Sequence, residues 1–328
     1  MLGRGGVFVL DRDLMCPAND PNPTDDTPET TPALVVKRAT LDLNGHTVTC
    51  GQRTVCIKIN GATLINGTES GGLSHVGVRV GSNSLVRHVT LSHSVYALWI
   101  QGDKNIIFEN TAIGSIQTGF EIRGSYNTLA DNRASQNGNG FEAYGFEANR
   151  VGALGKGNVL IGNVADENVV GLRIVLQDGT QVIGNKARAN RLQGFSIGST
   201  RNVDFISNVA KRNGSRGRYF SAGIGLSENE DLIAMNNTAR ANLGDGFQVS
   251  AAWLEGKPQT LTLNHALSND RYGIHVQGTT PDPGTVQAVI GENIARGNQV
   301  DLKDDNADCH AAVWQDNTFD TASETCIH

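Results

Sequence analysis

Short segments of alternating apolar and variable residues recur along most of the chain. Each segment begins with glycine, once alanine, and continues with an apolar residue, a variable residue and a second apolar residue. Nine such segments follow one another at intervals of 20 to 31 residues, starting at Gly77, Ala97, Gly119, Gly140, Gly171, Gly194, Gly223, Gly246 and Gly273. Alternation with a period of two is typical of a β-strand with one buried face. The pattern therefore predicts a regular series of short strands.

Asparagines repeat in phase with these segments. Pairs of asparagine five residues apart occur at 132/137, 163/168, 185/190, 208/213, 237/242, 264/269 and 293/298, and alanine lies two residues after the first member of each pair. Asparagine tolerates left-handed turns, and its amide can bond to the same amide one repeat away. The frame of a leucine-rich repeat is missing, and the many glycines exclude a coiled coil. We therefore expect stacked coils with asparagine ladders at their corners.

These repeats predict an all-β, single-domain parallel β-helix (a solenoid) of about ten coils, each rising about 4.8 Å. Residues 33–298 are expected to form the solenoid, with 40–49 as its first coil. Residues 1–32 are expected to form an N-terminal cap and a Pro/Thr-rich loop, because five of the eight prolines lie within 17–32. Residues 299–328 are expected to form the C-terminal cap, since a stacked core needs a cap at each end.

The composition argues against two classes of partner. The 328 residues carry a formal charge of −6, and a general nucleic-acid binder would present a broad basic surface instead. No apolar stretch reaches the roughly 18 residues that span a bilayer. We therefore expect no nucleic acid partner and no membrane partner.

All five cysteines lie near the two ends of the chain, at Cys16, Cys50, Cys56, Cys309 and Cys326. They include no CxxC pair of the kind that binds zinc. We expect a Cys309–Cys326 disulfide and a second disulfide between two of the three N-terminal cysteines, with the choice of pair left open. Stapling at both ends favours a secreted, extracellular protein, although the segment MLGRGGVFVL lacks the features of a signal peptide.

The third residue of each glycine-led segment should point away from the core, because side chains alternate along a strand. This outward row reads Arg79, Trp99, Glu121, Glu142, Arg173, Ser196, Gly225, Gln248 and His275. Stacking of Glu121 on Glu142 should raise the pKa of one carboxyl group, with Arg123 and Arg173 close enough to offset the effect. Arg123 is also expected one coil below Tyr144, where it would stabilise a phenolate base. The candidate catalytic residues are therefore Tyr144, Arg123, Glu142, Glu121 and Arg173.

Insertions predict a groove on this face. Segments 144–157, 250–259 and 278–284 follow their strands, whereas 214–221 precedes its strand, so they should rise on opposite edges. Between these edges the outward row consists of small residues, Ser196 and Gly225, which would form the floor of the groove. A groove of this kind suits an extended ligand. Lys211 and Arg212 should add positive charge at one wall. The candidate substrate-binding residues are Trp99, Arg150, Lys156, Arg216, Arg218, Gln248, Trp253 and His275.

The segment LDLNGHTV at 41–48, the glycine–asparagine coils and the final DC…W..NTF…C pattern resemble secreted right-handed parallel β-helix repeat proteins over residues 33–328. Many members of that superfamily are lyases, epimerases or hydrolases of acidic polysaccharides, which implies this substrate class. The segment YGFEAN at 144–149 is similar to the YGFDPH segment of alginate C5-epimerases. That similarity implies a catalytic role for Tyr144 and an acid role for Glu147, while Asn149 replaces the histidine of the pattern. The motifs of polygalacturonases and pectate lyases are absent.

We therefore expect an extracellular enzyme that acts on a uronate-containing polysaccharide by β-elimination or C5-epimerisation. The alternatives are a glycoside hydrolase that uses Glu121 and Glu142, and a non-catalytic glycan-binding surface protein. No cofactor and no metal ligand are assigned. Ca²⁺ is the one ion for which acidic oxygens gather, at Asp301, Asp304, Asp305 and Asp308.

Overall fold

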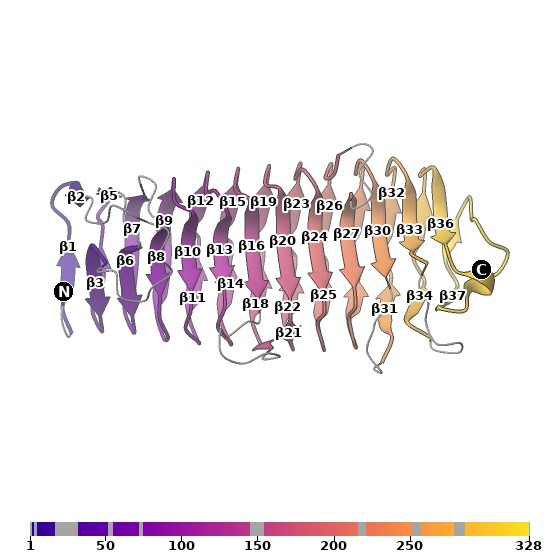
Figure 1. Cartoon of the computed structure of the whole chain (residues 1–328), viewed down its shortest axis with the longest axis horizontal. Helices are drawn as coiled ribbons and strands as arrows, with labels where there is room; N and C mark the ends of the chain where they lie inside the picture. Colours follow the sequence, from indigo (N-terminus) through magenta and orange to yellow (C-terminus); the bar gives the residue numbers. More distant parts are fainter. Residues whose placement is uncertain are drawn as a thin grey trace.

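The computed structural model describes residues 2, 5–16, 32–51, 55–71, 75–144, 154–215, 221–250, 257–278 and 286–327. They form an elongated stack of coils, with the two ends of the chain at opposite ends of the stack (Figure 1). Every strand pairing between neighbouring coils is parallel, as in a parallel β-helix. Within these ranges the one helical segment is the short turn η1 (Ala307–Cys309), and no helix is long and apolar enough to cross a membrane.

We call the face that carries the glycine-led segments the first face. It is a sheet of 12 strands, stacked in chain order along the rod. The strands are β3 (Leu34–Lys37), β6 (Val55–Asn60), β8 (Val76–Val80), β10 (Tyr96–Ile100), β13 (Thr118–Ile122), β16 (Asn139–Tyr144), β20 (Val170–Val175), β24 (Gln193–Gly198), β27 (Ala222–Ser227), β30 (Asp245–Ser250), β33 (Tyr272–Val276) and β36 (Val300–Asp304).

The remaining strands complete each coil on two shorter faces. The second face consists of β1 (Val7–Val9), β4 (Thr40–Asp42), β11 (Ile106–Phe108), β14 (Thr128–Ala130), β18 (Val159–Ile161), β22 (Gln181–Ile183), β25 (Asp204–Ile206), β28 (Ile233–Met235), β31 (Gln259–Thr262), β34 (Ala288–Gly291) and β37 (Ala312–Gln315). The third face consists of β2 (Leu14–Cys16), β5 (Thr47–Cys50), β12 (Thr111–Ile113), β15 (Arg133–Ser135), β19 (Val164–Asp166), β23 (Lys186–Arg188), β26 (Val209–Lys211), β29 (Thr238–Arg240), β32 (His265–Leu267), β35 (Ile294–Arg296) and β38 (Thr318–Phe319). The longer strands β7 (Thr63–Ser70) and β9 (Leu85–Ser92) run through both, and β17 (Gly155–Lys156) pairs with β21 (Gln177–Asp178) at the edge.

The stack extends on both sides of the 33–298 segment predicted for the solenoid. Before it, β1 pairs with β4 and β2 pairs with β5. After it, β36 pairs with β33 and β38 pairs with β35. The 12 strands of the first face also exceed the expected ten or so coils. Strand β36 escaped the prediction because its sequence, VDLKD, lacks the leading glycine of the repeat.

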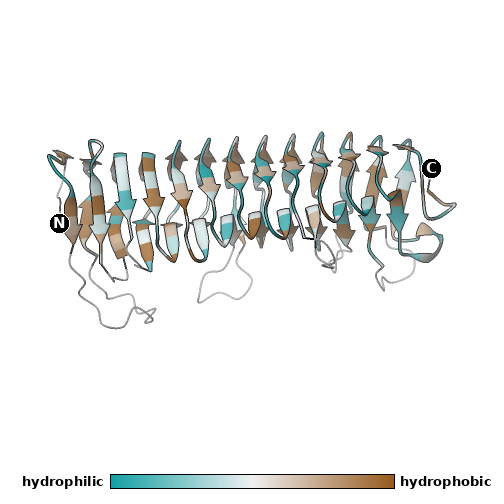
Figure 2. Ribbon diagram, turned by 90° about the horizontal axis from the view of Figure 1, so that it is seen from above, coloured by the Kyte–Doolittle hydropathy of each residue, from teal (hydrophilic) through white to brown (hydrophobic). Residues whose placement is uncertain are grey.

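The core is a column of stacked apolar side chains between the three faces. The strands carry both hydrophobic (brown) and hydrophilic (teal) residues (Figure 2). Phe120 and Phe141 stack at 4.8 Å between ring centroids, one coil apart. In these coils the core residues of the third face are alanines, such as Ala134 and Ala165, because the third face lies against the glycines of the first face. A Cβ atom on Gly140 would come within 3.0 Å of the Ala165 Cβ atom and within 2.6 Å of the Gly171 carbonyl oxygen. The repeated glycine and alanine therefore set the thickness of the coil.

The predicted asparagine ladders are confirmed. Asn163 is typical: its Oδ1 accepts the backbone N–H and the side-chain amide of Asn132 at 3.0 and 3.1 Å, and its own amide donates to Asn185 and to the Leu129 carbonyl. A second ladder runs through the later member of each pair. A third ladder, which the sequence analysis missed, joins Asn105, Asn127 and Asn158 at the remaining corner. Each ladder satisfies backbone groups at corners that cannot form strand pairings.

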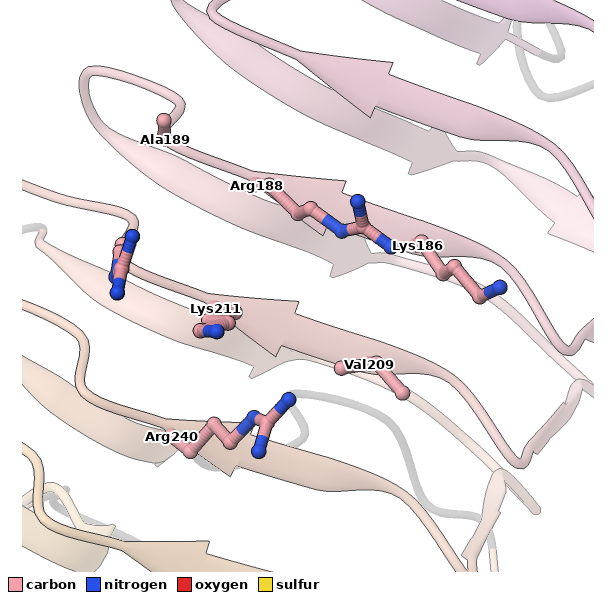
Figure 3. Close-up of a pocket in the computed structure, with 7 residues that line it drawn as sticks. Lys186, Arg188, Ala189, Val209, Lys211 and Arg240 are labelled. Atoms are coloured by element: carbon pink, nitrogen blue, oxygen red, sulfur yellow. The ribbon is translucent and has the colours of Figure 1, made fainter.

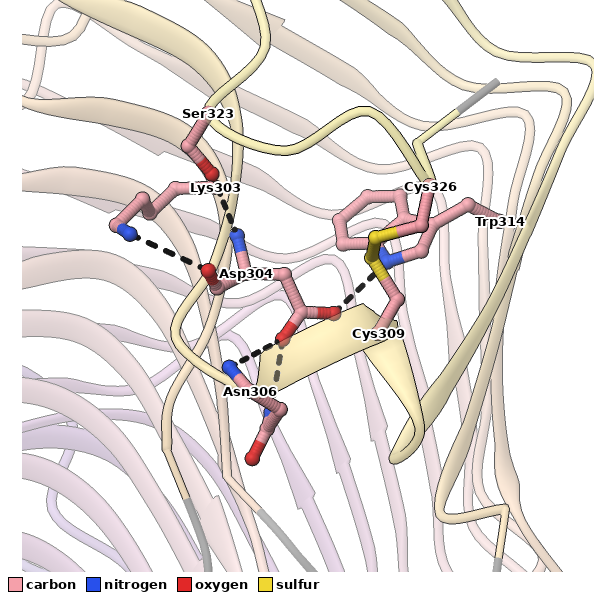
Figure 4. Close-up of a disulfide and its surroundings, with 7 residues drawn as sticks. All are labelled: Lys303, Asp304, Asn306, Cys309, Trp314, Ser323 and Cys326. Atoms are coloured by element: carbon pink, nitrogen blue, oxygen red, sulfur yellow. Dashed lines mark hydrogen bonds between the residues drawn. A yellow bond between two sulfur atoms is a disulfide. The ribbon is translucent and has the colours of Figure 1, made fainter.

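Disulfides lie near both ends. Cys309–Cys326 is confirmed, and the N-terminal bridge is Cys50–Cys56, which leaves Cys16 as a buried cysteine outside the two disulfides. The C-terminal cap is also fixed by the buried carboxylate of Asp304 (Figure 4). This carboxylate accepts the indole N–H of Trp314 at 2.9 Å and two N–H groups of Asn306.

One carboxyl group points into the core. The side chain of Glu69 on β7 is fully buried, and neither of its oxygens has a hydrogen-bond partner in the described part of the chain. Burial raises the pKa of Glu69 well above its usual value, because the low-dielectric core disfavours the charged form. The folded protein therefore holds a proton at Glu69 that the unfolded chain releases near pH 4.5.

We predict that Glu69→Gln stabilises the protein at neutral pH by about 2 kcal/mol. Because the pKa of Glu69 is raised on folding, the wild-type protein loses stability as the pH rises above the unfolded value, whereas the amide does not titrate. Urea unfolding at several pH values measures this. The gain should shrink as the pH falls toward 4.5, and an equal gain at every pH would contradict the account.

Candidate functional site

The predicted register of the first face is confirmed. Trp99 is paired with Glu121, Glu121 with Glu142, and Glu142 with Arg173, so these residues occupy equivalent positions on consecutive strands. The same row continues through Ser196, Gly225, Gln248 and His275 to Lys303. The outward column required for a site along the rod therefore exists.

The row is less open to solvent than expected. Trp99 is 8% exposed, Glu121 3%, Gln248 6% and His275 4%. Coils are only about 4.8 Å apart, so long side chains in one row cover one another. Charged groups in this row therefore lie partly outside water, and their interactions are stronger than at an open surface.

Glu121 and Glu142 form a carboxyl pair with separate partners. Arg123 donates from Nε to Glu121 Oε1 at 3.0 Å. Glu142 accepts a hydrogen bond from Arg173, a second from the Asn139 amide at 2.7 Å, and a third from the Thr118 hydroxyl. Hydrogen bonds from such donors stabilise the ionised form of a carboxyl group. Glu142 is therefore built to carry the negative charge of the pair.

The expected rise in the pKa of one carboxyl group is confirmed for Glu121. Burial, followed by the negative charge of Glu142, raises the pKa of Glu121 to about 7, although the Arg123 guanidinium acts in the opposite direction. The Oε2 atom of Glu121 is buried and has no hydrogen-bond partner among the described residues. Glu121 can therefore hold or release a proton near neutral pH, next to the Glu142 carboxyl group, which accepts hydrogen bonds from Arg173 and Asn139.

Trp99 holds the arginines and is not open for sugar stacking, in contrast to its predicted role. The guanidinium carbons of Arg79 and Arg123 lie over its ring at 5.1 and 4.9 Å from the centroid. Tyr96 stacks beside it at 5.3 Å. Arg123 therefore contacts both Trp99 and Glu121. Its buried indole Nε1 has no hydrogen-bond acceptor among the described residues.

The expected pairing of Arg123 with Tyr144 takes a different form. The register places Arg123 and Tyr144 directly after the paired residues Ile122 and Ala143. The guanidinium of Arg123, however, turns to Glu121 and Trp99. The contact with Glu121 arises because residues two apart lie on the same side of a strand. The sequence spacing also placed Tyr144 one coil away, and it did not rank these two neighbours of Arg123.

Much of the predicted groove wall lies outside the described residues. This holds for Arg150, Arg216, Arg218 and Trp253, and for Glu147 and Asn149 of the epimerase-like segment. Exposed Lys156 lies on β17 at the edge of the first face, where its backbone N–H donates to Ser125 Oγ. Among the candidate site residues, the carboxyl pair, Arg123, Arg173 and Trp99 are those that come together.

Lys211 and Arg212 do not stand at a wall of the first face. Lys211 is the last residue of β26 on the third face, and Arg212 follows it at the corner. They line a hollow with Lys186, Arg188 and Arg240. The expectation was wrong because the insertion that follows them begins only after the corner.

A second charged cluster surrounds His275 near the C-terminal end of the row. Its Nδ1 lies 2.9 Å from Asp245 and its Nε2 lies 2.8 Å from Asp305. Lys303 Nζ lies 3.1 Å from the other oxygen of Asp305. Burial opposes the charged imidazolium, but the hydrogen bonds that its ring donates to both aspartates outweigh burial and raise the pKa of His275. Both ring nitrogens are therefore engaged in structural ion pairs.

We predict that His275→Gln lowers the free energy of unfolding by about 2 kcal/mol at low pH. Because the pKa of His275 is raised on folding, this stabilisation is complete below the unfolded pKa near 6.5 and is lost as the pH rises through the folded value. Urea unfolding of both proteins across this range checks it. Exposed His265→Gln is the control and should change little. A His275 effect that does not vary with pH would refute the ion-pair role.

Two of the four acidic residues considered for Ca²⁺, Asp301 and Asp304, bind groups of the C-terminal cap. Asp301 accepts hydrogen bonds from Asn298 and from the backbone of Asp320 and Thr321. Asp304 binds Trp314 and Asn306, as described above. In the described part of the chain, no group of three or more His, Cys, Asp or Glu residues is arranged to hold a metal ion.

The chain belongs to the right-handed β-helix family. The model of that family, described as the right handed beta helix region, matches residues 35–187, 74–221 and 153–325. Comparison with curated proteins finds no match.

Solved structures share this fold at low sequence identity. The catalytic unit of a thermostable α-1,3-glucanase from Streptomyces thermodiastaticus is 13% identical, with a TM-score of 0.68 over 90% of our chain and 62% of that chain. Our chain thus spans less than two thirds of the glucanase unit. The A-modules of two Azotobacter vinelandii mannuronan C-5 epimerases, AlgE6 and AlgE4, are 11% and 13% identical, with TM-scores of 0.60 and 0.59. They are covered over 91% and 85% of their lengths, and our chain over 98% and 89%.

Proposed function

We propose that the protein is a carbohydrate-active enzyme that cleaves an acidic, uronate-containing polysaccharide, with Glu121 as the residue that transfers a proton. The observation that carries the proposal is the carboxyl pair: Glu121 with a pKa of about 7 beside Glu142, which is held by Arg173. A glycosidase needs one protonated and one ionised carboxyl group, and this pair provides both.

In the hydrolytic reaction Glu121 donates its proton to the glycosidic oxygen, and the leaving sugar departs with it. The Glu142 carboxylate attacks the anomeric carbon, and water then releases the product and restores the proton to Glu121. Adjacent coils separate such groups by about 4.8 Å, which suits the retaining mechanism. Arg123 bonds Glu121 Oε1, so a substrate that reaches Glu121 must displace the Arg123 side chain.

Positive charge at the site supports an anionic substrate. Below the pKa of Glu121, the guanidinium groups of Arg123 and Arg173 face a single ionised carboxylate, that of Glu142. The surplus charge would attract the carboxylate of a uronate residue. The glucanase and the mannuronan epimerases that share the fold also act on polysaccharides, and the two disulfides suit a secreted protein.

β-Elimination or C5-epimerisation is the second candidate reaction. It is favoured by the position of Tyr144, which ends the strand of Glu142 and lies one coil from Arg123. In that reaction a base removes the proton from C5 of a uronate whose carboxylate an arginine neutralises. Ionised Glu121 could serve as that base, and its activity would then rise with pH instead of falling.

The test is incubation of the protein with a panel of polyuronates and neutral glucans, with and without Ca²⁺. Hydrolysis predicts new reducing ends with retained anomeric configuration in NMR spectra of the polyuronate reactions, and no unsaturated product in ultraviolet spectra. Unsaturated product would establish elimination, and inverted uronate configuration would establish epimerisation. Binding of a polyuronate without any product would overturn the enzymatic proposal in favour of a glycan-binding protein.

A further inference from the structure

The third face carries a row of cations far from the carboxyl pair. Arg188, Lys211 and Arg240 occupy paired positions on the consecutive strands β23, β26 and β29. We call these three residues the basic ladder. Figure 3 shows them on successive coils, with Lys186 at the start of β23. The carboxyl pair lies on the first face, on the strands β13 and β16.

The Asp166 carboxyl group, one coil away, partly offsets the charge of Arg188, whereas Lys211 and Arg240 lie beside other cations. In the described part of the chain, none of its three members is within salt-bridge distance of a carboxylate. The neighbouring charges of Arg240 and Arg212 lower the pKa of Lys211. Like charges at directly opposed positions of a sheet destabilise it. A bound anion would remove this repulsion.

The surface around the basic ladder is hollowed, and the row of cations is bounded at both ends by other residues. The basic ladder lines a hollow of about 460 Å³, in which Ala189 and Val209 leave room between the longer side chains. Toward the N-terminal end the row continues with Asp166, which Arg133 binds at 3.0 Å. Toward the C-terminal end it continues with Leu267. The positive stretch therefore covers three consecutive coils.

We propose that the basic ladder is a binding site for an acidic polysaccharide chain that lies along the rod axis on the third face. The cations recur about every 4.8 Å, so successive carboxylates of an extended polyuronate can meet successive coils. The inference rests on the proposed function in that it takes the same class of polymer as ligand, held here without chemistry. Such a site would tether the polymer while the carboxyl pair acts on another stretch or another chain.

An acidic polysaccharide fits better than a nucleic acid. The patch covers only three coils, roughly 10 Å between the first and last cation, and the whole chain carries a charge of −6. A patch of this size can meet a few carboxylates of a polyuronate, whereas a nucleic-acid binder presents a broad basic surface. The described part of the ladder also offers no aromatic ring for base stacking, which single-stranded nucleic acids use.

The test measures binding of polygalacturonate oligomers by calorimetry at low salt. The probe proteins carry Glu121→Gln, so that turnover does not disturb the measurement. Adding Arg188→Gln, Lys211→Gln and Arg240→Gln should weaken binding at least about tenfold and flatten its dependence on salt. Arg12→Gln, Lys37→Gln and Arg38→Gln remove the same charge from exposed positions near the N-terminal end of the rod and should change affinity less than about twofold.

Equal binding by the ladder variant and its control would overturn the inference, as would the absence of any binding. Tighter binding of a single-stranded oligonucleotide than of polygalacturonate would overturn it in favour of a nucleic acid site. The proposed function fails separately: it falls if Glu121→Gln leaves turnover intact, whatever the ladder binds. When the three ladder substitutions are made without Glu121→Gln, KM for long polymers should rise and kcat for short oligomers should stay unchanged.

Discussion

Glu121→Gln is expected to lower kcat on a polyuronate by about a hundredfold to ten-thousandfold, because the amide cannot donate the proton that the leaving sugar requires. The side chain keeps its size and can remain beside Arg123 and Trp99, so substrate binding should survive. Steady-state kinetics, with reducing ends as the readout, separates the loss of kcat from any change in KM.

Glu324→Gln is the matched control, because it makes the same chemical change at an exposed position in the C-terminal cap. It should leave kcat unchanged. Circular dichroism should report the same fold for both variants. If Glu121→Gln retains wild-type kcat, proton transfer by Glu121 is excluded and the assignment of the carboxyl pair fails.

The pH dependence of kcat/KM distinguishes the two reactions. A general acid works only in its protonated form, so hydrolysis should decline as the pH rises through the pKa of Glu121, about 7. A base for elimination works in the ionised form, so kcat/KM for elimination would instead rise as the pH increases through the pKa of Glu121. Glu142→Gln removes a negative charge that raises the pKa of Glu121. The pH dependence of any remaining kcat/KM should therefore shift to lower pH.

The largest effect on stability is expected for Asn185→Ala. The change removes the acceptor for the Asn163 backbone N–H and side-chain amide, at 2.9 and 3.0 Å, and the donor for the Leu160 carbonyl. These groups are buried and have no access to water. At about 1–3 kcal/mol for each unsatisfied group, the free energy of unfolding should fall by about 4 kcal/mol.

Urea unfolding followed by circular dichroism measures this loss. Asn60→Ala is the control, because Asn60 is exposed at the end of β6, outside the ladders. Its effect should stay within about 0.5 kcal/mol. A similar small effect for Asn185→Ala would mean that the ladders do not hold the coils together.

Much of the fold could be predicted from local patterns. The alternation in the glycine-led segments defined which side chains point outward, and the parallel pairings of Trp99, Glu121, Glu142 and Arg173 confirm it. This works because a solenoid repeats one set of local contacts, so that a register read once applies to every coil. The Cys309–Cys326 bridge was predictable for a different reason, because both cysteines lie in the last loop of the chain.

The third asparagine ladder was missed for a reason of spacing. Asn105, Asn127 and Asn158 stack in space, but later coils use Gln177, Thr200 and Asn229 near the same corner, so the sequence shows no constant residue there. A hydrogen-bonding requirement can be met by several side chains, whereas the close approach at Ala165 admits only small ones.

The site was predictable in its members but not in their partners. Equivalent positions put Glu121 beside Glu142, yet they did not say that Arg123 would bond Glu121 and lie over the ring of Trp99. Such choices depend on rotamers and on burial, which the periodic pattern does not encode. Asp245 and Asp305 were missed beside His275 because they lie outside the glycine-led tetrads.

The most direct measurement is a titration of the Glu121 carboxyl group by ¹³C NMR in the intact protein, with the resonance assigned from its absence in Glu121→Gln. The proposed chemistry requires a midpoint at about pH 7. A midpoint near 4.5, the usual value for glutamate, would mean that Glu121 carries no proton at neutral pH and that the pair cannot act as acid and carboxylate.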